Sequence, residues 1–249
     1  MNEILFKYTL RIADSSLILG QRMSEWCSKG PTLEEDIALS NIALDLFGQS
    51  NGFYSYASQI EGIKSADDLA FLRNEREFFN HQIVELENGN FGDTIVRNFL
   101  YDSYNFLFYS ALKNSNDETL AALATKSLKE VKYHLRHSKN WLIRLGDGTE
   151  ESNTKVQKAL DNIWQYTSDL FEMDAIDLEM CKQKIGVNNT DLKTEWNKII
   201  NLTLQEAKLN RPNDGYIASG GKNGIHTEYL GFLLAEMQFM QRSYPNAKW

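Results

Sequence analysis

The chain has 249 residues and a formal net charge of -8, an acidic balance that excludes a role in coating nucleic acid, because phosphate binding requires clustered excess Lys and Arg. Cys27 and Cys181 lie far apart without a metal-type spacing, so we expect reduced thiols rather than a disulfide framework. The N-terminus is charged and the chain has no apolar twenty-residue segment, so we expect a cytoplasmic protein without a membrane span or secretory signal.

The first part of the chain predicts two long helices joined by a short connection. Prolines occur only at positions 31, 212 and 245, and the long interval between the first two favours an all-α fold. Apolar residues at helical spacing predict a helix from about Glu3 to Ser28. Thr32 and Glu35 form a capping-box pattern, so a second helix begins there and ends near Gly62.

The middle of the chain predicts two further long helices. Residues 67–86 are rich in Arg and Glu and predict one or two shorter helices along the outside of the protein. A turn at residues 88–90 precedes an aromatic helix over about 91–114. Ser115 and Glu118 form a second capping-box pattern, and the helix that follows, to Gly146, carries His134 on its apolar face.

The last part of the chain predicts helices over about 153–171 and 191–208, with a less regular stretch between them. Residues 220–224 lack the preceding strand and the Lys-Ser/Thr order of a phosphate-binding P-loop, so we interpret them as a flexible loop. Thr227 then caps a final helix that reaches Ser243. Without repeats or linkers, residues 1–249 predict a single domain, a four-helix bundle with additional C-terminal helices.

Acidic residues fall at similar heights on the four long helices if each pair is antiparallel. Counting from the connections places Asp14 near the level of Asp45, and Asp102 near the level of Glu130. A carboxylate on each of two helices, with a carboxylate and a histidine on each of the other two, is the ligand arrangement of a di-iron carboxylate bundle. These residues therefore mark a candidate metal site.

The ligand set of this candidate site is incomplete. Gly48 stands three residues after Asp45, where a histidine is required, and Val131 stands three residues before His134, where a carboxylate is required. A site without these donors would hold two irons poorly. We therefore interpret the set as vestigial, with no metal, cofactor-binding or catalytic residue in this chain.

Other interpretations of these residues remain open at this stage. The acids and His134 can form a metal-free polar core with basic neighbours, Asp14 for example pairing with a buried Arg or Lys. A single residual metal ion and a working di-iron site are the alternatives. Catalysis by this chain alone is not expected.

A basic stripe runs along the helix that contains His134. Its residues are Lys126, Lys129, Lys132, Arg136 and Lys139. A solvated helix face is the simpler interpretation, and a contact for an acidic partner or for the phosphates of coenzyme A is the alternative.

Several long blocks of the chain resemble the C subunits of bacterial phenylacetyl-CoA epoxidase, and the resemblance extends from the first helix to Trp249. The blocks are residues 25–27 (EWC), 41–49 (NIALDLFGQ), 88–95 (NGNFGDTI), 129–136 (KEVKYHLR) and 220–231 (GGKNGIHTEYLG).

This resemblance implies a ferritin-like, non-catalytic subunit of an oxygenase complex that epoxidises the ring of phenylacetyl-CoA in aerobic phenylacetate breakdown. It implies a separate catalytic di-iron subunit as partner, further subunits, and a reductase that uses NADPH, flavin and an iron-sulfur centre. This chain itself would hold no cofactor and would stabilise its partner. A self-sufficient di-iron oxidoreductase with an atypical ligand set is the alternative, and a ferritin-like storage or sensor protein is a third hypothesis.

Overall fold

The computed structural model describes residues 2–245 and 247, and every regular element within these residues is a helix. Trp249, where the resemblance ends, lies outside this part. The described chain divides into two compact units, one formed by residues 1–86 and 220–249 and the other by residues 87–219. A single domain over residues 1–249 stays a prediction.

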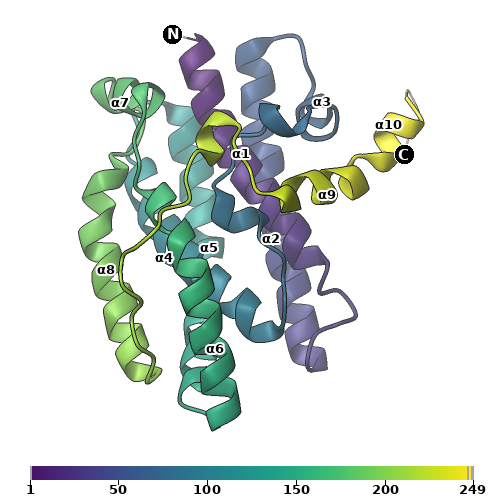
Figure 1. Cartoon of the computed structure of the whole chain (residues 1–249). Helices are drawn as coiled ribbons and strands as arrows, with labels where there is room; N and C mark the ends of the chain where they lie inside the picture. The colour runs from purple at the N-terminus through teal and green to yellow at the C-terminus, as the bar shows by residue number, and fades with distance from the viewer. Residues whose placement is uncertain (1, 246, 248–249) are drawn as a thin grey trace. The chain divides into compact units, whose positions relative to one another are not determined.

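The first unit is built on an antiparallel pair of long helices, α1 (Asn2–Ser24) and α2 (Leu33–Glu61) (Figure 1). The Thr32 hydroxyl caps α2 by accepting the backbone N–H of Glu35, as predicted, and Gly62 ends the helix with a φ of 80°. The α1 helix ends four residues earlier than expected. Residues 25–29 continue only as turns.

The segment after α2 is exposed around η1 but buried from about residue 78 to residue 86, so the prediction that it lies along the outside is wrong for that part. It contains α3 (Ala66–Phe71) and two single-turn helices, η1 (Glu75–Glu77) and η2 (Gln82–Glu85). The prediction failed because Arg and Glu were taken as surface residues, yet Arg73 and Glu85 are buried with partners.

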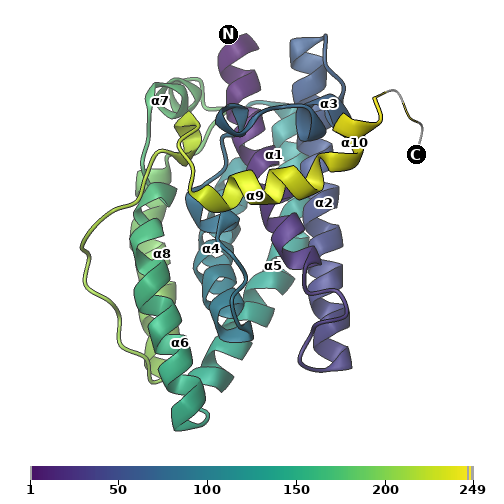
Figure 2. The same cartoon turned by 45° about the vertical axis from the view of Figure 1, so that its right-hand side comes forward.

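The C-terminal segment completes the first unit and comprises a turn, η5 (Gly221–Asn223), and two helices, α9 (Glu228–Met237) and α10 (Phe239–Ser243). The α9 helix lies crosswise to the long axes of α1 and α2 (Figure 2). The single final helix that the sequence predicts is therefore interrupted at Gln238, which caps α9. Thr227 occupies the N-cap position of α9, but its side chain makes no capping hydrogen bond.

The second unit is built on another antiparallel pair, α4 (Phe91–Leu112) and α5 (Glu118–Gly146) (Figure 1). Asn90 and Asp93 form the capping box of α4. The predicted box at Ser115 is wrong, because Asp117 caps α5 by accepting the backbone N–H of Leu120. The Ser115 hydroxyl instead donates to the carbonyl of Ile185, 2.8 Å away.

The predicted apolar face of α5 is confirmed. Its buried residues are Leu120, Ala124, Ser127, Leu128, Val131, His134, Ser138, Leu142 and Gly146. They recur every three or four residues, so they share one side of the helix.

Shorter elements complete the second unit. They are α6 (Glu150–Ile163), η3 (Trp164–Tyr166), η4 (Ser168–Leu170), α7 (Ala175–Lys182) and α8 (Asn189–Glu206). The α6 and α8 helices pack against the α4–α5 pair, and the buried indole of Trp196 on α8 donates a 3.0 Å hydrogen bond to the carbonyl of Leu100 on α4. The sequence predicted α6 and α8 but left the short α7 helix as irregular chain.

Candidate functional site

Asp14, the first predicted ligand, is fully buried on α1, and both of its carboxylate oxygens are occupied by protein donors. Oδ1 accepts from the hydroxyl of Tyr54 at 2.5 Å and from Nη2 of Arg73. Oδ2 accepts from Nη1 of Arg73 at 3.1 Å and from the backbone N–H of Phe79 at 2.8 Å. The interpretation that Asp14 pairs with a buried Arg is confirmed, and a metal ion could bind only by displacing the guanidinium.

The surroundings of Asp14 shift the pKa values of Arg73 and Tyr54. Burial lowers the pKa of Arg73, but the opposing effect of Asp14 and Tyr54 is larger, so the pKa lies above its ordinary value. Burial, reinforced by the Asp14 charge, raises the pKa of the Tyr54 hydroxyl well above its ordinary value. The Arg73 guanidinium also lies over the ring of Phe78, 4.2 Å from its centroid. The charged guanidinium of Arg73 and the neutral phenol of Tyr54 therefore lie together around the buried carboxyl group of Asp14.

Asp45 and Gly48 do not lie with Asp14, so the predicted height match on α1 and α2 is wrong. A Cβ at Gly20 would lie 2.9 Å from Phe47 and 3.3 Å from Leu46, which places Asp14 opposite a later part of α2. Tyr54 is the residue of α2 that contacts Asp14. Asp45 precedes Tyr54 by nine residues, which correspond to about two and a half helical turns, so Asp45 lies on the opposite side of α2. Gly48 is exposed, and a Cβ there would meet no atom within 4 Å.

Asp102, the predicted ligand on α4, lies against α5 with its Oδ2 accepting from the hydroxyl of Ser138 at 2.7 Å. Burial is the main cause that raises its pKa to about 6. His134, the Ser138 hydrogen bond, His137 and Arg97 act in the opposite direction. The second unit thus brings Asp102 and His134 into one buried polar group, with Ser138 as the member that the sequence prediction missed.

Glu130 and Val131 fill the remaining predicted positions on α5. Glu130 is half-buried, while Val131 is fully buried and carries no donor atom. The hydrogen bond of Asp102 goes to Ser138, eight residues beyond Glu130. Counting from the connection missed this, because the number of residues in a connection does not specify how far two antiparallel helices are offset along their axes.

These residues do not fit a di-iron centre. Among residues 2–245 and 247, no group of three or more His, Cys, Asp or Glu side chains has an arrangement that could hold a metal ion. Two bound irons require most of a shell of oxygen and nitrogen donors. In the first unit the potential donor Asp14 is already neutralised by Arg73.

A second buried network, which the sequence prediction missed, joins η2 to the start of α9. His226 has Nδ1 2.8 Å from Oε2 of Glu85 and Nε2 2.8 Å from the carbonyl of Phe78. The backbone N–H of Thr227 donates to Oε1 of Glu85 at 2.5 Å. Burial lowers the pKa of His226, but Glu85, the carbonyl of Phe78 and Asp14 together outweigh this effect and the pKa is raised. Both ring nitrogens face acceptors, so the imidazolium satisfies the geometry.

The glycine-rich block at residues 220–224 is packed and not the flexible loop that was predicted. A Cβ at Gly221 would collide with the carbonyl oxygen of Asn80, and one at Gly224 with that of Arg76. Gly220 and Gly224 have positive φ values of 106° and 75°. The block fastens the C-terminal segment to the chain between α3 and η2, and has a structural role.

The basic stripe lies on the side of α5 opposite the buried face. Lys139 forms an ion pair with Glu206 at 3.6 Å. The other four cations, from Lys126 to Arg136, are exposed. This side of α5 is therefore positively charged.

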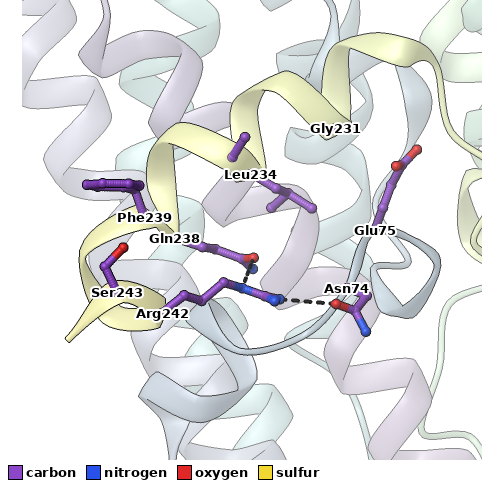
Figure 3. A pocket seen from close by; sticks show the side chains of 9 residues that line it. Asn74, Glu75, Gly231, Leu234, Gln238, Phe239, Arg242 and Ser243 are labelled. Atoms are coloured by element: carbon purple, nitrogen blue, oxygen red, sulfur yellow. Dashed lines mark hydrogen bonds between the residues drawn. The ribbon is translucent and has the colours of Figure 1, made fainter. Parts of the chain in front are cut away.

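A pocket of about 310 Å³ opens between η1 and the α9–α10 segment (Figure 3). Arg242 spans it, donating to Oε1 of Gln238 at 2.9 Å and to Oδ1 of Asn74 at 3.3 Å. Leu234 and Phe239 supply apolar walls and Glu75 a carboxylate. Arg242 also donates to the carbonyl of Arg73 at 2.8 Å, so it ties α10 to the chain next to the Asp14 network.

Comparisons with known proteins place these features in a family. No helix in the described part of the chain is both long and apolar enough to span a membrane. The sequence profile of the family described as phenylacetic acid catabolic protein matches residues 1–249. The C subunit of the 1,2-phenylacetyl-CoA epoxidase of Escherichia coli (strain K12) is 45% identical over 249 residues, which cover 100% of both chains. This match and the helices described above confirm the predicted all-α, ferritin-like fold class. The chain therefore belongs to the phenylacetic acid catabolic protein family.

Proposed function

We propose that this chain is a non-catalytic, cytoplasmic subunit of a phenylacetyl-CoA epoxidase, an oxygenase complex of phenylacetate catabolism, and that it pairs with and stabilises a catalytic di-iron subunit. The observation that carries the proposal is the 45% identity over the full length to the C subunit of such an epoxidase. The buried Asp14–Arg73 pair supports the non-catalytic part, because a guanidinium occupies the carboxylate that would bind iron.

The donor chemistry of the second unit also supports a structural role. The buried carboxylate of Asp102 on α4 is engaged by the hydroxyl of Ser138, whose hydrogen bond it accepts at 2.7 Å. Val131 offers an apolar side chain where a carboxylate is required. Asp14 and Asp102, two of the residues that correspond to a di-iron ligand set, instead accept internal hydrogen bonds, which fix the helices that carry them.

The cofactors of the proposed complex would lie in other chains. Di-iron would be held by the catalytic subunit, and NADPH, flavin and an iron-sulfur centre by a reductase. This chain would supply a rigid helical surface to its partner. A stable protein–protein interface of ordinary size buries about 800 Å² on each side, which two or three helices can provide.

The alternative is a self-sufficient di-iron oxidoreductase. It would require Arg73 to leave Asp14, which would place an unpaired charge in the interior. A storage or sensor protein would face the same obstacle. We therefore favour the role of a structural partner.

Metal analysis of the isolated chain, expressed with excess iron, tests the proposal together with co-purification of the catalytic subunit. We expect less than about 0.1 iron per chain and a stable complex with the catalytic subunit. Two tightly held irons per chain, lost in Asp14→Ala and Asp102→Ala, would support the self-sufficient enzyme instead.

Reconstituted activity separates a structural from a catalytic role. The variants Asp14→Asn and Asp102→Asn should leave the turnover of each assembled catalytic subunit unchanged, although the amount of assembled complex can fall. Loss of turnover in fully assembled complexes, with di-iron intact in the partner, would assign a catalytic part to this chain.

A further inference from the structure

The basic stripe is an unusual surface for this protein. Lys126, Lys129, Lys132 and Arg136 follow one another at steps of three or four residues, so they form a row along the exposed side of α5. The chain as a whole carries a formal net charge of -8. Like charges at these spacings repel one another, so the row weakens the helix that bears it. A face shaped only for solubility would mix the two signs.

Glu130 is the one acidic residue of α5 between Lys126 and Arg136, and the four cations of the row are not paired with it. Within residues 2–245 and 247, none of the four forms an ion pair within 4.0 Å. Lys155 and Lys198, in contrast, pair with Glu151 and Glu195 on their own helices, at 2.6 and 2.8 Å. The positive charge of the row is therefore not neutralised locally.

The shape of the row favours an extended acidic surface over a small phosphate ligand. From Lys126 to Arg136 a helix rises by about 15 Å, which is the length of nearly three turns. The pocket beside η1 and α9, and two others lined by residues of α1–α3 and of α4–α6, include no cation of this row. A free phosphate is normally held by convergent donors, whereas carboxylates on a second helix repeat at the same spacing as this row.

An aromatic residue lies within the row. Tyr133 is 38% exposed, and the guanidinium of Arg136 lies 5.5 Å from the centroid of its ring. Exposed Tyr and Arg side chains are the types that dominate the binding energy of protein interfaces. The stacking also holds the Arg136 group in place before a partner arrives.

We propose that the basic stripe of α5 docks an acidic helix of the catalytic partner. The inference rests on the proposed function and adds to it the surface of contact and the charge of the partner's surface. Charge complementarity of this kind raises the rate of association and makes that rate fall with ionic strength. The alternative docking surface for the partner is on α2. It consists of the exposed apolar residues Leu33, Ile37 and Leu44.

The association rate of the full chain with the purified catalytic subunit, measured by stopped flow at about 50 and 300 mM NaCl, tests the inference. We expect the wild-type rate to fall at least about tenfold between the two salt concentrations. The variant Lys129→Glu/Lys132→Glu/Arg136→Glu should associate at least about tenfold more slowly at the lower salt, with a flat or reversed salt dependence. The corresponding triple Gln variant should lie between the two.

A matched control separates the stripe from net charge. Lys158→Glu/Lys182→Glu/Lys193→Glu makes the same change in charge at exposed positions on α6, α7 and α8 of the same unit. Its association rate should stay within about twofold to threefold of the wild type. Circular dichroism and thermal unfolding check that both triple variants are folded.

The possible outcomes are distinct. If the wild-type chain forms no complex with the catalytic subunit, the proposed function fails and this inference with it. If the complex forms but the two triple variants behave alike, this inference alone is wrong, and loss of binding in Ile37→Glu/Leu44→Glu would move the contact to α2. If the stripe variant loses affinity for free coenzyme A while its association with the partner is unchanged, the stripe is a phosphate site and the inference is overturned.

Discussion

Arg73 donates to both carboxylate oxygens of Asp14 through its two terminal nitrogens, in an interior where both side chains are almost completely buried. The contact joins the first helix to the chain that follows α3, 59 residues later. Tyr54 on α2 donates to the same carboxylate, so a single acid connects three segments of the first unit. The carboxylate of Asp14, a possible metal ligand, therefore serves to hold these three segments together.

Removal of Arg73 alone should strongly destabilise the protein. We expect Arg73→Met to lower the free energy of unfolding by about 3–5 kcal/mol, because Asp14 would stay buried without its counter-charge. Asp14→Asn/Arg73→Met should lose less than the sum of the single variants by more than about 1 kcal/mol, because neither charge is left behind. Urea unfolding followed by circular dichroism measures both, and strictly additive losses would show that the two groups do not interact.

Asp102→Asn should stabilise the protein at neutral and alkaline pH. The pKa of Asp102 is raised in the folded state from 3.8 to about 6, so its favourable contribution is complete below the lower value and is lost as pH rises through the higher one. The amide oxygen of Asn can still accept the hydrogen bond of Ser138. We expect a gain of about 1–3 kcal/mol near pH 8 and little gain below about pH 4.

Urea unfolding across this pH range measures the gain, with Ser138→Ala as a companion variant that removes the hydrogen bond but leaves the carboxylate. A variant Asp102→Asn that is less stable than the wild type near pH 8 would show that the ionised carboxylate is required by its neighbours.

His226 should make the protein less stable as pH rises above about 6.5. The folded-state pKa is raised above 6.5, so the stabilisation is complete below that value and is lost as pH rises through the folded-state pKa. Glu85 faces the imidazolium directly, and Asp14 adds a weaker attraction. His226→Gln should lower the free energy of unfolding by about 1–3 kcal/mol near pH 6 and remove most of this dependence.

An NMR titration of the His226 ring in the wild type and in Glu85→Gln tests the cause. The pKa should fall in the variant, because the carboxylate that favours the imidazolium is gone. An unchanged pKa would assign the shift to the carbonyl of Phe78 instead.

Two glycines should respond to alanine in opposite directions. Gly221→Ala places a Cβ against the carbonyl oxygen of Asn80, and we expect a loss of about 1–3 kcal/mol. Gly48→Ala meets open space within α2, and we expect a gain of up to about 1 kcal/mol from helix propensity. Thermal unfolding of the two variants side by side measures both. Equal effects would contradict the packing of the glycine-rich block.

Local signals explain what could be predicted from the sequence. Thr32 and Gly62 bound α2 through contacts with residues three or four positions away, so the sequence predicts both ends correctly. The burial of His134 follows from helical spacing alone. The partner of Asp14 could be anticipated only as some Arg or Lys, because Arg73 reaches it across 59 intervening positions.

The wrong predictions arise where contacts between residues far apart in the sequence decide the structure. Asp117 and Ser115 are both plausible caps, and the contact of Ser115 with Ile185, 70 residues away, decides between them. Glu85 was expected at the surface because its partner, His226, lies 141 residues later. The relative heights of α1 and α2 depend on how the connecting turns pack, which the number of residues between helices does not specify.

The first unit combines residues 1–86 with residues 220–249, and Arg11 donates to the carbonyl of Lys222, 211 positions away, at 3.3 Å. During translation, Arg11 of α1 must therefore wait for residue 222, synthesised much later, before it has this acceptor, although Asp14 and Arg73 can pair earlier. The second unit is one uninterrupted stretch of chain and can finish folding earlier, while the ribosome is still elongating. The α1–α2 pair would thus be completed after the second unit, and until residues 220–249 are synthesised it would remain accessible to proteases and chaperones.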